Sequence, residues 1–142
     1  MKFNKPSFFY GLGDKASLYK TMQKYVNIVP IDWNNVKIHN LKTDIVIGFS
    51  FGGIWACEYT LKHKIKTLIL CSMTTGVESL DMLKVDEVIF IAGENEKWVI
   101  KDIKRLSKTL KCKWRLIIVP NAEHKLSGEY RQVLTKLIRE LQ

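Results

Sequence analysis

The sequence lacks the features that mark several common classes of protein. Its longest apolar runs are the size of a strand, far below the ~20 residues of a transmembrane helix, so we expect no membrane-spanning segment. The apolar stretch near the N-terminus is too short for a secretory signal and has no small-residue cleavage site. The cysteines are odd in number and without metal-ligand spacing, which predicts buried free thiols at Cys57, Cys71 and Cys112. These absences together predict a cytoplasmic protein.

Arginine is scarce for a chain with a net charge of +9. Of 23 basic residues only four are arginine, namely Arg105, Arg115, Arg131 and Arg139. Arginine is favoured for paired hydrogen bonds to phosphates and bases, and the lysines are scattered as on solvated helix faces. We therefore expect no specific nucleic-acid partner and interpret the charge as serving solubility. Binding to polyanions or to anionic lipid is the alternative, and a steep dependence of binding on salt would favour it.

Motifs for phosphate, metal and dinucleotide binding are also missing. The sequence has no phosphate-loop lysine motif and no metal-ligand spacing. The stretch Gly11-Leu12-Gly13 lacks the third glycine of a dinucleotide fingerprint, so we expect no cofactor and no metal ion. Internal repeats, linkers and low-complexity segments are absent as well. A length of 142 residues then predicts a single domain over residues 1–142.

What the sequence does contain is a regular alternation of apolar strands and amphipathic helices. The hydrophobic period predicts six strands, at residues 7–10, 26–31, 44–49, 66–71, 87–92 and 113–119. It predicts helices at about 15–25, 52–63, 97–110 and 126–141, whereas 32–43 and 72–85 have no clear period. This alternation is typical of an α/β fold, a three-layer sandwich whose mostly parallel six-stranded sheet has helices on both faces.

Two of these elements carry finer predictions. The helix over residues 15–25 places Leu18, Met22 and Tyr25 on its buried face. The last strand begins with Lys113 and Arg115, and such charges suit a sheet edge because they discourage pairing with another chain.

Residues 48–53 (Gly-Phe-Ser-Phe-Gly-Gly) carry the clearest chemical signal. An apolar strand precedes them and a helical pattern follows, which matches the Gly-x-Ser-x-Gly nucleophile elbow. In such a turn Ser50 adopts a strained positive φ, and Gly48 and Gly52 leave room for the strand and helix to pass closely. The helix N-terminus, including the Phe51 N–H, favours developing negative charge. The alternative interpretation is a glycine-rich turn in which Ser50 only caps the helix.

Three further loops follow predicted strands, at residues 10–13, 93–96 and 120–124. The ligand site of a parallel sheet lies at the carboxyl ends of its strands, so we expect these loops to lie beside the Ser50 turn. Together the loops supply a serine, a carboxylate and a histidine. Their order along the chain is nucleophile, acid, histidine, the order that α/β-hydrolases use.

On these motifs the chain resembles the α/β-hydrolase superfamily from residue 7 to residue 141. Residues 48–53 resemble its nucleophile elbow, and residues 120–124 resemble the loop that carries its histidine. Residues 10–13 (Tyr-Gly-Leu-Gly) resemble its His-Gly-x-Gly oxyanion loop, with tyrosine in place of histidine. Residues 91–96 resemble the stretch that ends in its acid, with glutamate in place of the usual aspartate. The family's first two strands and its lid are missing, so the resemblance implies a truncated, lidless α/β-hydrolase fold.

The resemblance also implies a role for each residue of the predicted site. Ser50 attacks an acyl carbonyl, and His124 takes the serine proton and later protonates the leaving group. Glu96 orients His124 and stabilises its charged form. The backbone N–H groups of Leu12 and Phe51 hold the oxyanion.

Two aromatic residues are expected to border the substrate pocket, Tyr10 in the oxyanion loop and Trp98 just past the acid. Of the two carboxylates that follow the fifth strand, we expect Glu96 to serve as the acid and Glu94 to point towards solvent. Glu123 is expected to point away from the neighbouring histidine ring. Besides Glu94, the alternatives for the acid are Asp81 and Asp86, which follow the fourth strand, or a serine–histidine pair without an acid.

These residues predict a serine hydrolase that cleaves small carboxylic esters or thioesters through an acyl-enzyme intermediate on Ser50. Residues 72–85 are too few for a helical cap, which predicts an open site that prefers short acyl chains. The alternative is a catalytically weak or inactive ligand-binding protein on a hydrolase scaffold, because a fold alone does not establish activity.

Overall fold

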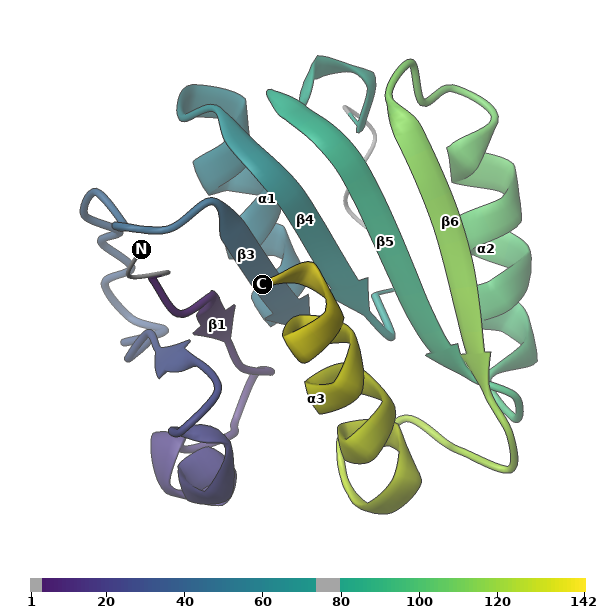
Figure 1. Cartoon of the computed structure of the whole chain (residues 1–142), viewed down its shortest axis with the longest axis horizontal. Coiled ribbons are helices and arrows are strands. Elements are labelled where there is room, and N and C mark those ends of the chain that lie inside the picture. Colours follow the sequence, from purple (N-terminus) through teal and green to yellow (C-terminus); the bar gives the residue numbers. More distant parts are fainter. Residues whose placement is uncertain (1–3, 74–79) are drawn as a thin grey trace.

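The computed structural model describes residues 4–73 and 80–142. Its centre is a six-stranded sheet of order β2-β1-β3-β4-β5-β6, in which every neighbouring pair is parallel (Figure 1). The strands are β1 (Ser7–Phe9), β2 (Asn27–Ile28), β3 (Ile45–Phe49), β4 (Ile65–Cys71), β5 (Val85–Gly93) and β6 (Lys113–Val119). All six predicted strands are present, and the predicted α/β class is confirmed.

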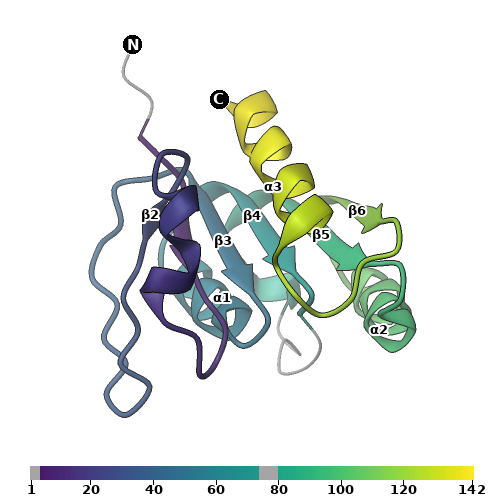
Figure 2. The same cartoon turned by 90° about the horizontal axis from the view of Figure 1, so that it is seen from below.

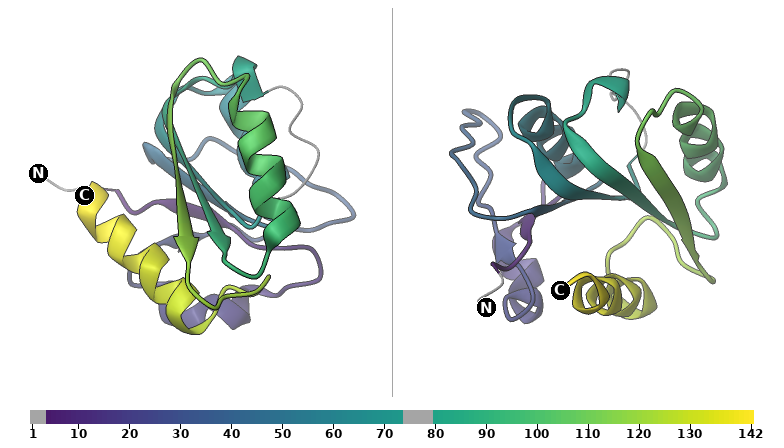
Figure 3. Two further views of the ribbon diagram at one scale, coloured as in Figure 1. Left: turned by 90° about the vertical axis from the view of Figure 1, so that its right-hand side faces the viewer. Right: turned by 45° about the horizontal axis from the view of Figure 1, so that its top comes forward.

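Helices cover both faces of this sheet. Two of them, α1 (Gly52–Lys62) and α2 (Lys97–Ser107), lie on one face. The 3₁₀ helix η1 (Ala16–Met22) and α3 (Gly128–Leu141) lie on the other face (Figure 2, Figure 3). A short 3₁₀ turn, η2 (Leu80–Met82), precedes β5. The predicted three-layer arrangement is therefore confirmed.

Successive side chains of the central strands enter two different cores. In β5, Ile89 and Ile91 belong to the core under η1 and α3. Val88 and Phe90 belong to the core under α1 and α2. Because both faces of the sheet are covered, both sets of side chains are buried, and the strand appears in the sequence as an unbroken apolar run.

The first helix differs from the prediction. In place of an α-helix over residues 15–25, the chain forms the 3₁₀ helix η1, which is interrupted at Tyr19 (φ −112°, ψ 17°). Tyr19 is buried and Leu18 is 58% exposed, so the predicted buried face is wrong at Leu18. The reason is tertiary. The Tyr19 hydroxyl donates a hydrogen bond to the Asp14 carboxylate, and its ring packs edge-on against Phe8 with 5.0 Å between centroids.

The second strand is shorter than predicted, with two residues in place of the span 26–31. Pro30 has no N–H to continue a ladder. The N–H of Ile31 donates to the hydroxyl of Tyr10 at 2.7 Å and not to a neighbouring strand. The chain therefore leaves the sheet soon after β2 and passes over the end of β1.

The strand β6 forms an edge of the sheet, as predicted. Lys113 and Arg115 reach across to Glu87 of β5, with N–O distances of 3.5 and 3.7 Å. Both basic side chains are exposed, and charges along an open edge discourage another chain from pairing with it.

The three cysteines are free. Cys57 and Cys71 are buried, as predicted, whereas Cys112 is only partly buried. Burial without a charged partner raises the pKa of the Cys57 thiol well above its ordinary value, so that thiol stays protonated. Within the described part of the chain, no helix has the length and apolar character that crossing a membrane requires.

Candidate active site

The turn between β3 and α1 has the strained geometry that its sequence predicts. Ser50 has a φ of 54°, in the left-handed region. A Cβ on Gly48 would lie 2.7 Å from the nitrogen of Gly53, and a Cβ on Gly52 would lie 2.7 Å from the carbonyl carbon of Phe9. Side chains at these two positions would collide with backbone. The glycines therefore allow α1 to begin directly against β3 and β1, with Ser50 held at the carboxyl end of β3.

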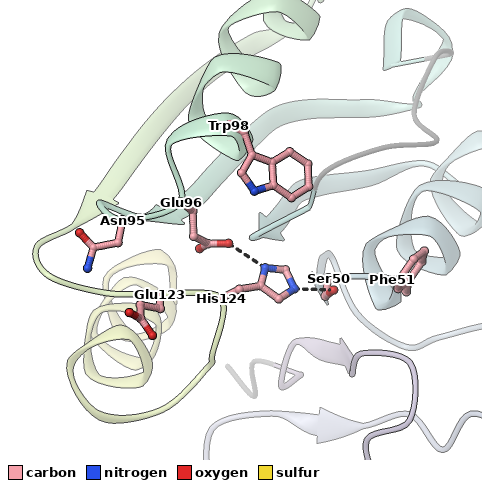
Figure 4. Close-up of a pocket in the computed structure, with 7 residues that line it drawn as sticks. All are labelled: Ser50, Phe51, Asn95, Glu96, Trp98, Glu123 and His124. Carbon is pink, nitrogen blue, oxygen red and sulfur yellow. Dashed lines mark hydrogen bonds and ion pairs between the residues drawn. The ribbon is translucent and has the colours of Figure 1, made fainter.

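Three side chains from distant parts of the sequence form one hydrogen-bonded chain (Figure 4). The Ser50 Oγ lies 2.9 Å from His124 Nε2, and His124 Nδ1 lies 2.7 Å from Glu96 Oε2. Because a carboxylate only accepts, Nδ1 carries the proton in this arrangement and Nε2 accepts from the serine hydroxyl. The geometry is that of a nucleophile, a general base and an orienting acid.

The Glu96 carboxylate is buried, with only 5% of the residue exposed. Its second oxygen, Oε1, accepts hydrogen bonds from the Gly93 N–H at 2.9 Å and from the Ser72 hydroxyl at 2.5 Å. Burial acts to raise the pKa of Glu96, but the hydrogen bonds from His124, Ser72 and Gly93 outweigh it and hold that pKa below its ordinary value. The carboxylate is therefore ionised at neutral pH and can stabilise a charged imidazolium.

Ser72 belongs to this network, although the sequence analysis does not single it out. It follows β4 with a φ of 52° and is completely buried. Its hydroxyl oxygen lies 2.5 Å from Glu96 Oε1 and 2.7 Å from the Tyr130 hydroxyl. The available sequence signal is weak: a serine directly follows an unbroken apolar strand, in the same strand-end position as Ser50 after β3.

Glu94, the other carboxylate after β5, makes a different contact. It is exposed, and its Oε1 accepts a hydrogen bond from the backbone N–H of Asn121 at 3.1 Å. The Asn95 N–H donates to the Ala122 carbonyl at 3.0 Å. These two bonds join the loop after β5 to the loop that carries His124. Glu94 thus contacts the backbone of the histidine loop, whereas the neighbouring Glu96 contacts the histidine ring.

The two predicted oxyanion donors are backbone N–H groups of segments that contact Ser50. Phe51 is the next residue and occupies the N-cap position of α1. Leu12 lies in a turn over residues 11–14 that a 3.1 Å backbone hydrogen bond closes. A Cβ on Gly11 would lie 3.5 Å from the Ser50 Cβ, so this turn packs against the serine. Within the described residues neither the Leu12 nor the Phe51 N–H donates a hydrogen bond, so both donors are free to meet a ligand.

A pocket of about 480 Å³ opens beside Ser50 (Figure 4). It is lined by Ser50, Phe51, Asn95, Glu96, Trp98, Glu123 and His124. Trp98 and Phe51 are 60% and 46% exposed, so two aromatic side chains border the serine without enclosing it. Among the described residues, no group of three or more His, Cys, Asp or Glu side chains is arranged to hold a metal ion.

Tyr10 does not line this pocket, which corrects the prediction that paired it with Trp98. Its side chain is buried, its hydroxyl accepts from the Ile31 N–H at 2.7 Å, and its ring stacks on Tyr19 with 6.2 Å between centroids. The hydroxyl thus pairs with the Ile31 N–H, which has no strand partner because β2 is short. Tyr10 therefore supports the loop over residues 10–13 from within the core.

The fold of this chain is shared with several solved structures. They include a dienelactone hydrolase from Anabaena variabilis, with a TM-score of 0.77 and 17% identity over 97% of this chain and 84% of that one. A serine hydrolase homologue from Coxiella burnetii matches with a TM-score of 0.70 and 13% identity over 99% and 88% of the two chains. SOBER1 from Arabidopsis thaliana matches with a TM-score of 0.61 and 12% identity over 99% and 100%. No family model and no curated protein matches the sequence. The chain has an α/β-hydrolase-type fold in a truncated form.

Proposed function

We propose that this protein is a serine hydrolase that cleaves small carboxylic esters or thioesters through an acyl-enzyme intermediate on Ser50. The observation that carries the proposal is the hydrogen-bonded chain from the Ser50 hydroxyl through His124 to the buried Glu96 carboxylate, with distances of 2.9 and 2.7 Å. Solved structures of the same fold are hydrolases by name, which supports hydrolytic chemistry in general.

In this reaction His124 Nε2 removes the proton from Ser50 Oγ as that oxygen attacks the acyl carbonyl carbon. The new C–O bond pushes the carbonyl electron pair onto oxygen and gives a tetrahedral oxyanion. The protonated imidazole then donates its proton to the alcohol or thiol as the bond to the leaving group breaks. Water, deprotonated by the same nitrogen, hydrolyses the acyl-enzyme and regenerates the serine. Throughout, the Glu96 carboxylate holds the ring and stabilises its charged form.

The oxyanion is held by the backbone N–H groups of Phe51 and Leu12. Phe51 directly follows Ser50, the turn that holds Leu12 packs against the serine, and the N-terminus of α1 adds its partial positive charge there. Losing one donor of this kind typically costs ~3 kcal/mol of transition-state stabilisation. Since both donors are backbone groups, side-chain substitutions at these positions leave them in place.

The acyl group is expected to be small. Phe51 and Trp98 border the serine but are 46% and 60% exposed, so among the described residues the pocket encloses little apolar surface. Each methylene contributes ~0.8 kcal/mol to binding only where protein covers it. The prediction that residues 72–85 add no helical cap lies partly outside the described residues, which do not include 74–79.

Labelling with a fluorophosphonate probe tests the proposal. An activated serine oxygen attacks the phosphorus and displaces fluoride, so the wild-type protein gains a covalent adduct on the peptide that contains Ser50. Ser50→Ala should gain none. Ser127→Ala is the matched control, because Ser127 is exposed at the N-terminus of α3 and its side chain makes no capping bond. An unlabelled wild type that still binds esters is the outcome expected of a ligand-binding protein on a hydrolase scaffold, and it would overturn the proposal.

A cytoplasmic location and the lack of a specific nucleic-acid partner stay predictions from the sequence. The charge of +9 is compatible with weak binding to polyanions, and a salt titration on an anionic vesicle or nucleic-acid surface checks this.

A further inference from the structure

Ser72 occupies a backbone position that disfavours serine. It follows β4 with a φ of 52°, where a side chain costs roughly 1 kcal/mol that glycine would avoid. The residue is completely buried, so an unpaired hydroxyl would carry a further desolvation cost. Its backbone N–H donates to the Ile91 carbonyl at 2.8 Å and continues the pairing of β4 with β5. Glycine could make that backbone bond too, so what serine adds at this position is its hydroxyl.

The protons available fix the direction of the side-chain hydrogen bonds. The Ser72 hydroxyl has one proton and donates it to Glu96 Oε1 at 2.5 Å. In its 2.7 Å contact with the Tyr130 hydroxyl, Ser72 is therefore the acceptor and Tyr130 the donor. The Tyr130 hydroxyl also donates to the Ile91 carbonyl oxygen at 2.9 Å. Its single proton is therefore shared between two acceptors, the Ser72 hydroxyl oxygen and the Ile91 carbonyl oxygen. A chain of donors thus runs from Tyr130 through Ser72 to the carboxylate.

The carboxylate at the end of this chain belongs to a glutamate. A glutamate has one more rotatable bond than an aspartate, so holding its carboxylate in one orientation costs more conformational entropy. Oε2 faces His124 Nδ1 at 2.7 Å, and Oε1 accepts from Ser72 and from the Gly93 N–H. Two donors on Oε1 leave Oε2 in a single position towards the imidazole.

We propose that Ser72 and Tyr130 are positioning residues that fix the Glu96 carboxylate against His124. The inference rests on the proposed function, because the orientation of the imidazole matters most when His124 acts as a general base. Neither positioning residue lines the pocket beside the nucleophile. Their influence on turnover is therefore expected to pass through Glu96.

Ser72→Gly separates positioning from folding. Glycine accepts the left-handed backbone, so relief of strain offsets the lost hydrogen bonds, and the unfolding temperature should move by about 5 °C or less. The kcat for p-nitrophenyl acetate should fall about 10- to 100-fold with KM little changed, because a misaligned base slows chemistry more than binding. Ser107→Ala is the matched control, since Ser107 is also a buried serine and its hydroxyl donates only to the Lys104 carbonyl within α2, at 3.0 Å. A kcat equal to that of the wild type would overturn the proposal.

A residue that acts through Glu96 should have no effect once Glu96 is gone. In a Glu96→Ala background, Ser72→Gly should change kcat by less than about twofold, because the two substitutions remove the same interaction. Tyr130→Phe keeps the ring packing and leaves the Ile91 carbonyl paired with the Ser72 N–H, so it should give a smaller loss of about 2- to 5-fold. An equal loss from Ser72→Gly in both backgrounds would indicate a general structural role and overturn the proposal.

The proton on His124 Nδ1 gives a readout that does not depend on turnover. In the wild-type protein its NMR resonance should lie far downfield, because it is hydrogen-bonded to the carboxylate. Ser72→Gly should move the resonance upfield or broaden it, and Ser107→Ala should not. A wild type without esterase activity in which Ser72→Gly still shifts this resonance would refute the proposed function and leave the positioning role standing. An unchanged resonance would overturn the positioning role whatever the activity.

Discussion

Ser50 and Ser72 directly follow adjacent strands of the sheet and have nearly the same φ. Their φ angles are 54° and 52°, and each backbone N–H donates at 2.8 Å to the strand that follows in the sheet, at Cys71 and Ile91. Their surroundings are opposite. Ser50 is partly exposed, and its hydroxyl meets His124 at the edge of a pocket, whereas Ser72 is completely buried, and its hydroxyl meets Glu96.

The difference shows that one strand-end geometry can serve two purposes. A left-handed residue after a parallel strand turns its side chain out of the strand's regular alternation. After β3, glycines and the start of α1 leave the hydroxyl open to a ligand. After β4, the hydroxyl is buried, and its partners are Glu96 at the N-terminus of α2 and Tyr130 in α3. The surroundings of the turn, and not its backbone, therefore decide which of the two proposed roles the serine has, nucleophile or positioning residue.

The largest effect is expected from Ser50→Ala. Turnover of p-nitrophenyl acetate should fall by roughly 10⁴- to 10⁶-fold, because alanine removes the oxygen on which the proposed acyl-enzyme forms. Circular dichroism and the unfolding temperature should match the wild type. If Ser72→Gly cost as much activity as Ser50→Ala, the two serines would not differ in role, and the distinction drawn between them would be wrong.

Glu96→Gln is expected to have the second largest effect. The substitution keeps the size of the side chain but removes the charge that favours imidazolium, so kcat should fall roughly 10²- to 10⁴-fold. Glu94→Gln should stay within about twofold of the wild type, because glutamine still offers an oxygen to the Asn121 N–H. A fall in kcat for Glu94→Gln with none for Glu96→Gln would assign the role of the acid to Glu94. The hydrogen bond from Ser72 to Glu96 would then have no part in positioning the acid.

The stability of the protein should depend on pH through the same carboxylate. Since the pKa of Glu96 is held below its ordinary value in the folded protein, the charged form stabilises the fold above the unfolded pKa of ~4.3. That contribution is lost as the pH falls through the folded pKa. Glu96→Gln should therefore destabilise the protein more at pH 7 than at pH 3 in guanidinium denaturation. An equal loss of unfolding free energy at both pH values would show that the hydrogen bonds, including that from Ser72, do not favour the charge.

The smallest effects are expected on the open side of Ser50. A series of p-nitrophenyl esters should give the highest kcat/KM at short acyl chains, with no activation by lipid interfaces. Trp98→Ala should change kcat/KM for the butyrate ester by only about 2- to 5-fold, because the indole is largely exposed and covers few methylenes. A preference for long chains would mean that another surface encloses the substrate and that Ser50 is less open than the described residues indicate.

The sequence predicts those parts of the site whose geometry depends on neighbouring residues, and misses those that depend on distant ones. The Ser50 turn is recognisable because its backbone demands glycine at the two flanking positions, 48 and 52. Ser72 has no such flanking signal, and its partners lie 24 and 58 residues away, so only the folded chain brings the three together. Asp86, an alternative for the acid, pairs with Lys64 on the surface at 3.5 Å.

The parts of the fold that the sequence does not predict also depend on contacts between residues far apart in the chain. The strands β1, β3, β4 and β5 follow from apolar runs, because burial on both faces leaves a local pattern. The helix over residues 15–25 fails because the Tyr19 contacts with Asp14 and Phe8 override the hydrophobic period. The prediction that Tyr10 borders the pocket is wrong because the Tyr10 hydroxyl accepts a hydrogen bond from the Ile31 N–H. The position of Tyr10 in the motif does not reveal this contact.

The separation of Ser50 and His124 along the chain also has a consequence for synthesis. The two residues are 74 positions apart, and His124 lies beyond β6, the edge strand. On the ribosome, the serine turn emerges long before the imidazole does. In the proposed mechanism the Ser50 hydroxyl has no base until β6 has paired with β5 and the loop after it has closed, and until then it is no more nucleophilic than a free serine. The proposed activity is therefore expected to begin only once translation has passed His124.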